Sequence, residues 1–273
     1  MVQLIGFYME NNAGMLLHAR DVRGVHTLTL NTPANFNALG SELIVAMQKA
    51  LDAIAADAGS RAVVIAANGK AFCAGHNLKD MSANPRLEYY QNLFAQCSRM
   101  MLSIARLPVP VIGRVHGMAT AAGCQLVTQC DLAVASPTAQ FATSGINYGL
   151  FCSTPSVPLT RTTAAKQAMY MLVTGDFIDA PTAHRYGLIN AVANDDTPAA
   201  LDAEIEKLLQ SICAKPRAAL QLGKELFYQQ QSLSLDAAYQ LAGQTMAVNM
   251  MQESAQEGVR AFVEKRAPVW KAR

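Results

Sequence analysis

The sequence HGMATAAGCQLVTQCD, residues 116–131, decides the fold of this chain. An apolar run, VPVIGRV (residues 109–115), leads into it, and the small residues Ala121, Ala122 and Gly123 precede an apolar segment that we predict to be helical. Small residues at a strand-to-helix junction let another atom approach the backbone, and the first N–H groups of a helix have no partner within it. Such a junction suits developing negative charge, although the same residues also fit tight packing of a helix on a sheet.

A second stretch of this kind, GKAFCAGHNLKD, covers residues 69–80. It follows AVVIAA (residues 62–67), which we predict to be a buried strand. An Ala-Gly elbow precedes His76, whose backbone N–H is then free to point in the same direction as that of Ala122. Adjacent parallel strands lie about 5 Å apart, so N–H groups at their ends converge on one oxygen. The two elbows together predict an oxyanion hole.

Composition limits the classes of function. Of 273 residues, 51% are hydrophobic and 15% charged, and the formal net charge is only +2, which favours a globular protein with a small-molecule partner over one that binds nucleic acid or an anionic membrane. Six cysteines without a CxxC pair indicate reduced thiols, with no metal site and no disulfide framework. The first residues, MVQLIGFYMENNAG, lack a basic region leading into an apolar one, and no apolar run is long enough to span a membrane. We therefore expect a cytoplasmic protein.

The order of elements along the chain is typical of an α/β fold. Strands alternate with helices up to about residue 195, which predicts a parallel sheet with crossover helices in residues 1–195 and a helical region in residues 196–273. Ser41 is expected to cap its helix. The elements that we predict are a hairpin over residues 15–31, helices over 41–56 and 86–106, and strands over 62–67, 111–115, 132–135, 140–143 and 188–193.

Six segments in the same order resemble the crotonase superfamily, also called the enoyl-CoA hydratase/isomerase superfamily. They are KAFCAGHNLKDM, VHGMATAAGCQL, CDLAVAS, AQFATSGINYGL, TGDFIDAPTAHRYGLINAV and EGVRAFVEKRAPVW. The resemblance covers about residues 15–270 and implies a spiral of β-β-α units with a C-terminal helical trimerisation region, assembled as a homotrimer or homohexamer. It also implies an acyl-CoA ligand, no permanently bound cofactor, and enoyl-CoA hydratase as the nearest activity.

The resemblance assigns roles to particular positions. The backbone N–H groups of His76 and Ala122 correspond to the oxyanion hole. The carbonyl of Ala74 corresponds to the group that receives the adenine amino group, whereas Ala34 stands where a hydratase has a basic residue. The positions implied for binding coenzyme A or the acyl group are Ala34, Asn35, Phe36, Ala38, Ala74, Asn77, Leu78, Gly123, Phe262 and Lys265.

The two glutamates that hold water in a hydratase are replaced here by Gln125 and Gly145. A carboxamide and a glycine do not transfer protons near neutral pH. The loop SGINYGLFCSTP (residues 144–155) also lacks the acidic base of a family isomerase. We therefore expect hydration of crotonyl-CoA to be weak or absent, and glutamates at both positions to raise its rate.

Other polar residues are weaker candidates for the missing base. Cys152 lies in the loop that lines the acyl pocket of relatives, but no adjacent histidine is evident. The side chain of His76 is expected to face the loop surface. His116 and Asp131 are expected to be structural, His184 to be a surface or interface residue, and the methionines of residues 246–251 to provide packing surface. Two hypotheses stay open: an acyl-CoA enzyme, such as an isomerase or a thioester hydrolase, and a non-catalytic acyl-CoA-binding or interaction protein.

Overall fold

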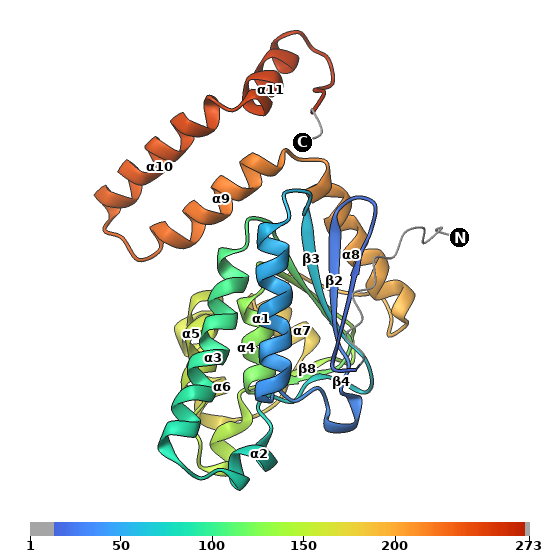
Figure 1. The fold of residues 1–273 in the computed structure, drawn as a ribbon, viewed down its shortest axis with the longest axis vertical. Coiled ribbons are helices and arrows are strands. Elements are labelled where there is room, and N and C mark those ends of the chain that lie inside the picture. The colour runs from blue at the N-terminus through green and yellow to red at the C-terminus, as the bar shows by residue number, and fades with distance from the viewer. Residues whose placement is uncertain (1–13, 271–273) are drawn as a thin grey trace.

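The computed structural model describes residues 14–270 and contains two sheets flanked by helices (Figure 1). Residues 1–13, which contributed to the prediction of location, lie outside this range. The larger sheet consists, in spatial order, of β1 (Leu16–Arg20), β2 (Val25–Leu30), β3 (Ala62–Ala67), β5 (Val111–Val115), β7 (Leu132–Ala135) and β10 (Ala191–Val192). The smaller sheet consists of β4 (Ala71–Cys73), β6 (Met118–Thr120), β8 (Gln140–Ala142) and β9 (Ile178–Asp179).

Helices follow most pairs of strands. Those of the first part are the 3-10 helices η1 (Pro33–Asn35) and η2 (Ser144–Tyr148) and the α-helices α1 (Ser41–Ala56), α2 (Leu78–Ala83), α3 (Leu87–Arg106), α4 (Ala122–Gln129), α5 (Ser153–Thr162), α6 (Ala165–Thr174) and α7 (Ala180–Tyr186). The last four are α8 (Pro198–Cys213), α9 (Arg217–Gln230), α10 (Leu235–Met250) and α11 (Glu253–Val263). None of the helices within the described range is long and apolar enough to cross a membrane.

The unit that repeats along the chain is a strand of the larger sheet, a strand of the smaller sheet and then a helix. β3 and β4 precede α2 and α3, β5 and β6 precede α4, and β7 and β8 precede α5. Within each sheet the corresponding strands pair in parallel, as in β3 with β5 and β4 with β6. The expected spiral of β-β-α units with C-terminal helices is thus confirmed.

Strand β3 lies at the centre of the larger sheet and is buried on both faces. Val63 and Ile65 pack in the core beneath α1 and α3, whereas Ala62 and Val64 pack with α8 on the opposite face (Figure 1). A strand covered by helices on both faces has no polar face, which explains its uninterrupted apolar sequence. The α8 side chains that cover the second face, Leu201, Ile205 and Leu209, recur every four residues along one side of the helix.

Most predicted boundaries agree with the structure, with four corrections. The single predicted sheet is two sheets, because β4 and β6 belong to a separate layer. Gly40, not Ser41, occupies the N-cap of α1, and no side chain caps that helix. The strand predicted over residues 188–193 is restricted to β10, and β9 precedes α7 where no strand was predicted.

The C-terminal helices project from the core, and a buried polar cluster joins them to it. α9 and α10 form a helical hairpin beyond the end of the larger sheet (Figure 1). The Lys224 ammonium of α9 donates to the carbonyl oxygens of Ile104 and Val109, at 2.9 and 3.0 Å, and to Asp131 Oδ2 at 2.6 Å. Asp131 also accepts from Tyr228 Oη at 2.8 Å and from the backbone N–H of Val111 at 2.6 Å. Asp131 is therefore structural, as predicted.

Candidate active site

The two small-residue elbows meet at the ends of β4 and β6. These strands are parallel neighbours, with Cys73 opposite Ala119. A Cβ atom on Gly75, whose φ is +92°, would lie 2.9 Å from Ala121 Cβ and 3.2 Å from the backbone nitrogen of Ala122. Only glycine adopts this φ easily and leaves room for the second elbow. The elbows follow the short strands β4 and β6. The sequence had predicted that they follow the longer strands β3 and β5.

Both elbows carry a backbone N–H without a partner. In residues 14–270, neither His76 N nor Ala122 N donates a hydrogen bond to a protein acceptor. Ala122 is the first residue of α4 and only 1% exposed, so its N–H is an unpaired donor at the positive end of a helix. Buried N–H groups without partners are rare in folded proteins, and this pair is suited to an oxygen supplied by a ligand.

Strain in the second elbow helps to orient Ala122. Ala121 has φ 50° and ψ −119°, a region that residues with a Cβ seldom occupy. The backbone nitrogen of Ala121 donates to the carbonyl oxygen of Ala142 at 3.0 Å, which holds the turn against β8. A Cβ on Gly123 would lie only 2.0 Å from the carbonyl oxygen of Cys73, so glycine is required there. Gly123, a predicted binding residue, therefore has a packing role in this structure.

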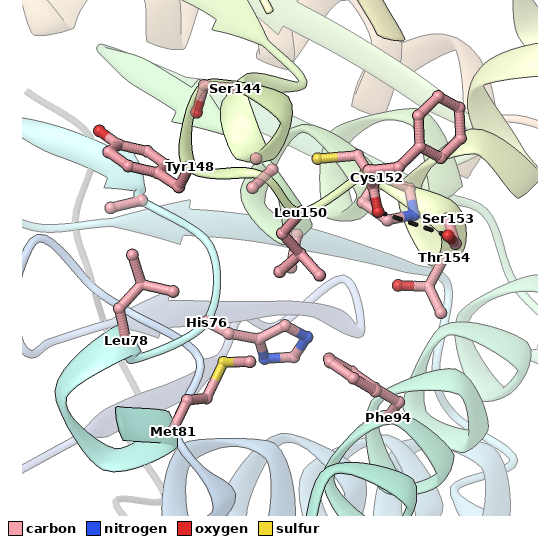
Figure 2. Close-up of a pocket in the computed structure, with 16 residues that line it drawn as sticks. His76, Leu78, Met81, Phe94, Ser144, Tyr148, Leu150, Cys152, Ser153 and Thr154 are labelled. Carbon is pink, nitrogen blue, oxygen red and sulfur yellow. Dashed lines mark hydrogen bonds between the residues drawn. The ribbon is translucent and has the colours of Figure 1, made fainter. Parts of the chain in front are cut away.

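A cavity of about 170 Å³ lies against the two elbows. Its wall includes Ala74, His76 and Ala122, together with side chains from α2, α3, η2 and the segment that leads into α5 (Figure 2). None of the 16 described residues that line it is aspartate, glutamate, lysine or arginine. The cavity is therefore apolar and uncharged, an environment in which oriented N–H dipoles act on a bound carbonyl with little competition from water.

The side chain of His76 lies inside this cavity, contrary to the prediction that it faces the loop surface. Figure 2 shows its ring among Met81, Phe94 and Leu150, and its centroid is 5.4 Å from that of Phe94. Nδ1 lies 3.0 Å from the carbonyl oxygen of Leu39, which only accepts, so Nδ1 carries the proton. Nε2 is buried without a protein partner, and burial lowers the pKa of His76 below 6.5.

Neither position of the hydratase glutamates offers a proton-transfer group. Gln125 lies one turn after the elbow, is 4% exposed, and has a buried side-chain oxygen without a partner. Gly145 lines the cavity, but a Cβ there would lie 2.5 Å from the carbonyl oxygen of Leu150 and 2.9 Å from Cys152 Sγ. A glutamate at position 145 therefore requires the loop to move.

Cys152 lies in the cavity wall but stays a thiol at neutral pH. It is 6% exposed, and burial raises its pKa above 9.0, an effect that a hydrogen bond with the Gly145 backbone only partly offsets. A protonated, buried thiol is a poor nucleophile. All six cysteines lie in the described part of the chain and are free.

The loop over residues 34–38, which was predicted to bind coenzyme A, lies beside the cavity and does not line it. The backbone nitrogen of Ala74 donates to the carbonyl oxygen of Phe36 at 3.0 Å, which joins this loop to the end of β4. Sequence reasoning missed Asn37, which is fully buried and donates to the carbonyl oxygens of Asn68 and Ala71 at 2.8 and 2.9 Å. Asn37 also has a positive φ of 55°, a backbone conformation that the sequence alone did not indicate. The predicted residues of this loop are exposed or half-buried: Ala34, Asn35, Phe36 and Ala38.

The predicted residues at the start of α2 divide between two roles. Leu78 lines the cavity and is 52% exposed, so it lies at the rim. The side-chain oxygen of Asn77 caps α2 by accepting from the backbone nitrogens of Lys79 and Asp80, at 3.1 and 3.4 Å. Asn77 therefore orients this helix and does not line the cavity wall.

The structure does not bring Phe262 and Lys265 to the cavity. Phe262 lies in α11 and Lys265 follows it, and α11 lies at the opposite end of the molecule from α2 (Figure 1). Phe262 is 85% exposed, and Trp270 Nε1, in the same segment, donates to the carbonyl oxygen of Ala214 at 2.9 Å. The prediction that these two residues join the site is therefore not met within one chain, because α9 and α10 carry them away from it.

The other histidines lie outside the cavity. His116 donates from Nε2 to the carbonyl oxygen of Gly69 at 2.8 Å, and burial lowers its pKa, so its role is structural as expected. His184 is exposed on α7. Groups of three or more metal-binding side chains are absent from the part of the chain that the structure describes.

Paired backbone donors at the strand ends of neighbouring β-β-α units, facing an apolar cavity, define a protein of the crotonase class. The chain belongs to the enoyl-CoA hydratase/isomerase family, whose sequence profile matches residues 20–273. The sequence motifs also predict a particular similarity to enoyl-CoA hydratase domain-containing protein 3 and its bacterial relatives. That similarity is confirmed by the relatives described next.

The mitochondrial enoyl-CoA hydratase domain-containing protein 3 of Xenopus laevis is 42% identical over 247 residues, covering 90% of this chain and 83% of that protein. The crystal structure of the human protein of the same name has a TM-score of 0.89 at 39% identity and covers 94% of this chain and 100% of that chain. An enoyl-CoA hydratase structure from Mycobacterium smegmatis has a TM-score of 0.91 at 58% identity and covers 94% of this chain and 98% of that chain.

The relatives contradict the prediction of a cytoplasmic location. The Xenopus laevis, Danio rerio and Homo sapiens proteins are all named as mitochondrial. The prediction rested on the composition of the first residues of this chain. That composition gave no indication of the mitochondrial location in the names of these relatives.

Proposed function

We propose that the chain binds a coenzyme A thioester and polarises its carbonyl group with the backbone N–H groups of His76 and Ala122. The observation that carries the proposal is the pair of unpartnered N–H groups on the wall of an apolar cavity. Enzymes of the crotonase family use coenzyme A thioesters as substrates, which supports the choice of ligand. The acyl group would occupy the cavity, and the coenzyme would pass Ala74 and the loop over residues 34–38.

Two donors of this kind stabilise an enolate or a tetrahedral oxyanion more strongly than they stabilise the ground-state carbonyl. Negative charge on oxygen strengthens each hydrogen bond, and the fixed backbone needs no reorganisation as the charge develops. The N-terminus of α4 adds the favourable field of the helix dipole at Ala122. The proposed activity is therefore chemistry that passes through a thioester oxyanion, within the enoyl-CoA hydratase-like group.

Hydration itself is not supported by the cavity. Gln125 and Gly145 supply no acid or base. Within the described chain, no aspartate, glutamate, lysine or arginine lines the cavity to take over that role. The second candidate function, an acyl-CoA-binding protein without catalysis, is favoured by this same observation. The two functions share the binding step and differ in whether a base is present.

Calorimetry with two ligands tests the proposal. Hexanoyl-CoA carries the thioester carbonyl, whereas S-hexyl-CoA, a thioether of the same chain length, lacks that oxygen. Two hydrogen bonds of about 1 kcal/mol each predict that the thioester binds about thirty-fold more tightly. Equal affinities would contradict the oxyanion contacts, and no heat from either ligand at millimolar concentration would contradict coenzyme A binding.

We further propose that each chain consists of a core, residues 1–195, and an assembly region, residues 196–273. The assembly regions would join three or six chains into a homotrimer or homohexamer. α10 has no buried residue, and Tyr239, Met246 and Met251 are 73%, 70% and 75% exposed. Apolar surface of this extent is typical of a contact between proteins. Light scattering should return the mass of a trimer or hexamer, and a stable mass near 29.3 kDa would contradict the proposal.

A further inference from the structure

A second and larger concavity, the C-terminal groove, lies between the core and the last helices of the chain. Its volume is about 1060 Å³, compared with about 170 Å³ for the cavity beside the elbows. Its walls are the β1–β2 turn, the connection between α1 and β3, the start of α9, and α11 with the segment that follows it. Figure 1 shows these elements at the end of the molecule opposite α2. A concavity of this size has room for a metabolite.

Positive charge gathers in the C-terminal groove. The whole chain has a formal net charge of only +2. The described lining of the groove nevertheless contains seven cationic residues and only two carboxylates, Glu253 and Glu257. The seven belong to four segments that are far apart in the sequence, so no local motif indicates them. They are Arg20, Arg23, Arg61, Lys215, Arg217, Arg260 and Arg266.

Carboxylates neutralise three of these seven cations. Arg20, Arg23 and Arg266 each form an ion pair, with N–O distances of 3.1, 2.7 and 2.6 Å. Within residues 14–270, no carboxylate forms an ion pair with the other four. Like charges that face one groove repel each other, and a bound anion removes that repulsion. The four cations without a carboxylate are Arg61, Lys215, Arg217 and Arg260.

Two of these four are held in place by backbone carbonyl groups and keep further donors free. Arg61 Nη2 donates to the carbonyl oxygens of Cys213 and Lys215, at 3.1 and 2.5 Å. Arg217 Nε donates to the carbonyl oxygen of Ser60 at 3.2 Å. In the described chain, Arg61 Nη1 and Arg217 Nη2 have no acceptor, and neither atom is enclosed by protein. Donors that are already oriented lose little entropy when an anion binds.

Linked phosphate groups suit this arrangement better than a single small anion. A guanidinium group offers two parallel N–H bonds that match two phosphate oxygens. The free cations lie on separate walls, because Lys215 precedes α9 whereas Arg260 belongs to α11. A chain of phosphate groups contacts more than one wall, whereas a single carboxylate or phosphate satisfies fewer of the cations.

An aromatic side chain completes the lining of the groove. Trp270 Nε1 donates to the carbonyl oxygen of Ala214 at 2.9 Å, which fixes the ring next to the start of α9. A Cβ atom on Gly258 would lie 3.3 Å from this ring, so the ring is packed against α11. An indole beside arginine side chains provides a surface on which a nucleobase stacks.

We propose that the C-terminal groove binds a polyphosphate anion, either inorganic or carried by a nucleotide. The site is separate from the proposed acyl-CoA site, because none of the described residues lines both the groove and the cavity. The bound phosphates contact cations of the core and of α11 together. Binding therefore also holds α11 against the core, which stabilises the folded arrangement.

Calorimetry with inorganic tripolyphosphate and with ATP, both without divalent metal ions, tests this site. The double variant Lys215→Gln with Arg260→Gln removes two exposed cations whose side chains form no hydrogen bond within residues 14–270. We expect it to bind tripolyphosphate at least about tenfold more weakly than the wild type. The matched control, Lys49→Gln with Arg99→Gln, removes the same charges from exposed positions of α1 and α3 and should retain the wild-type affinity.

Hexanoyl-CoA should bind equally to the wild type and to Lys215→Gln with Arg260→Gln, because the groove is separate from the cavity. No saturable binding of either anion, equal weakening by both double variants, or a parallel loss of hexanoyl-CoA affinity would overturn this inference. Tighter binding of ATP than of tripolyphosphate supports a nucleotide as the ligand, and equal or weaker binding supports an inorganic polyphosphate. Binding of tripolyphosphate without any binding of hexanoyl-CoA would overturn only the proposed function.

Discussion

Replacement of Gln125 by glutamate restores one of the two carboxylates of a family hydratase without changing the size of the side chain. Gln125 is 4% exposed, and its side-chain oxygen is buried without a hydrogen-bond partner. No hydrogen bond within residues 14–270 stabilises a carboxylate at this position. We therefore expect Gln125→Glu to place an unpaired acid in a buried site, where burial favours its neutral form.

The magnitude follows from the displacement of the pKa. Full burial raises the pKa of a glutamate by up to about 3–5 units, and each unit corresponds to about 1.4 kcal/mol. Because the folded state then holds a proton that the unfolded chain releases above about pH 4.3, stability decreases as pH rises. Compared with the wild type, the variant should have a similar free energy of unfolding at pH 4 and one about 4 kcal/mol lower at pH 8.

Urea unfolding at several pH values measures this difference, with Gln129→Glu as the matched control. Gln129 is on the same helix but only half-buried, so its replacement should produce little pH dependence. Crotonyl-CoA hydration should stay weak in both the wild type and Gln125→Glu, because the acid stays neutral and position 145 has no carboxylate. A parallel pH dependence in wild type and Gln125→Glu, or rapid hydration by the variant, would refute this reasoning.

Three further predictions follow from contacts elsewhere in the molecule. Lys224→Met should lower the free energy of unfolding by about 3–5 kcal/mol, measured with urea, because it removes the positive charge that pairs with Asp131 and the donor to the carbonyl oxygens of Ile104 and Val109; a loss below 1 kcal/mol would contradict this. Burial lowers the pKa of His26 to about 4. Between pH 4 and pH 6.5, His26 is therefore neutral in the folded protein and charged in the unfolded chain. Stability should therefore fall by about 3 kcal/mol from pH 7 to pH 4, and His26→Gln should reduce that slope; an unchanged slope would contradict the assignment. Gly145→Ala should cost about 1–3 kcal/mol by forcing apart a loop in which a Cβ meets Leu150 O at 2.5 Å, and a thermal midpoint equal to the wild type would count against that clash.

The parts of the fold that the sequence predicts well are those with a strong local pattern. The apolar run of β3 and the periodic apolar positions of α1 and α3 identify buried elements without knowledge of their neighbours. β4 and β6 are three residues long, too short for a period-2 pattern, and are strands only because they pair with each other. The second sheet was missed for this reason, although the elbows that follow these strands were found.

The candidate site was predicted in part for similar reasons. Backbone N–H groups depend on local turns, so His76 and Ala122 were found from Gly75 and its small neighbours. The direction of the His76 ring depends on the carbonyl oxygen of Leu39, a residue 37 positions earlier in the chain, and no local pattern contains that contact. The same limit applies to Gly145, because the atoms that fill the space beside it belong to the turn five to seven residues later.

The most direct test of the central claim is the carbonyl stretching frequency of a bound thioester. Difference infrared spectroscopy with hexanoyl-CoA carrying ¹³C at the carbonyl carbon separates this band from those of the protein backbone. Two oriented N–H donors in an apolar cavity weaken the C=O bond more than water does, so the bound band should lie at lower frequency than that of the free ligand in water. A bound band at the frequency found in water, or above it, would show that His76 and Ala122 do not polarise the thioester.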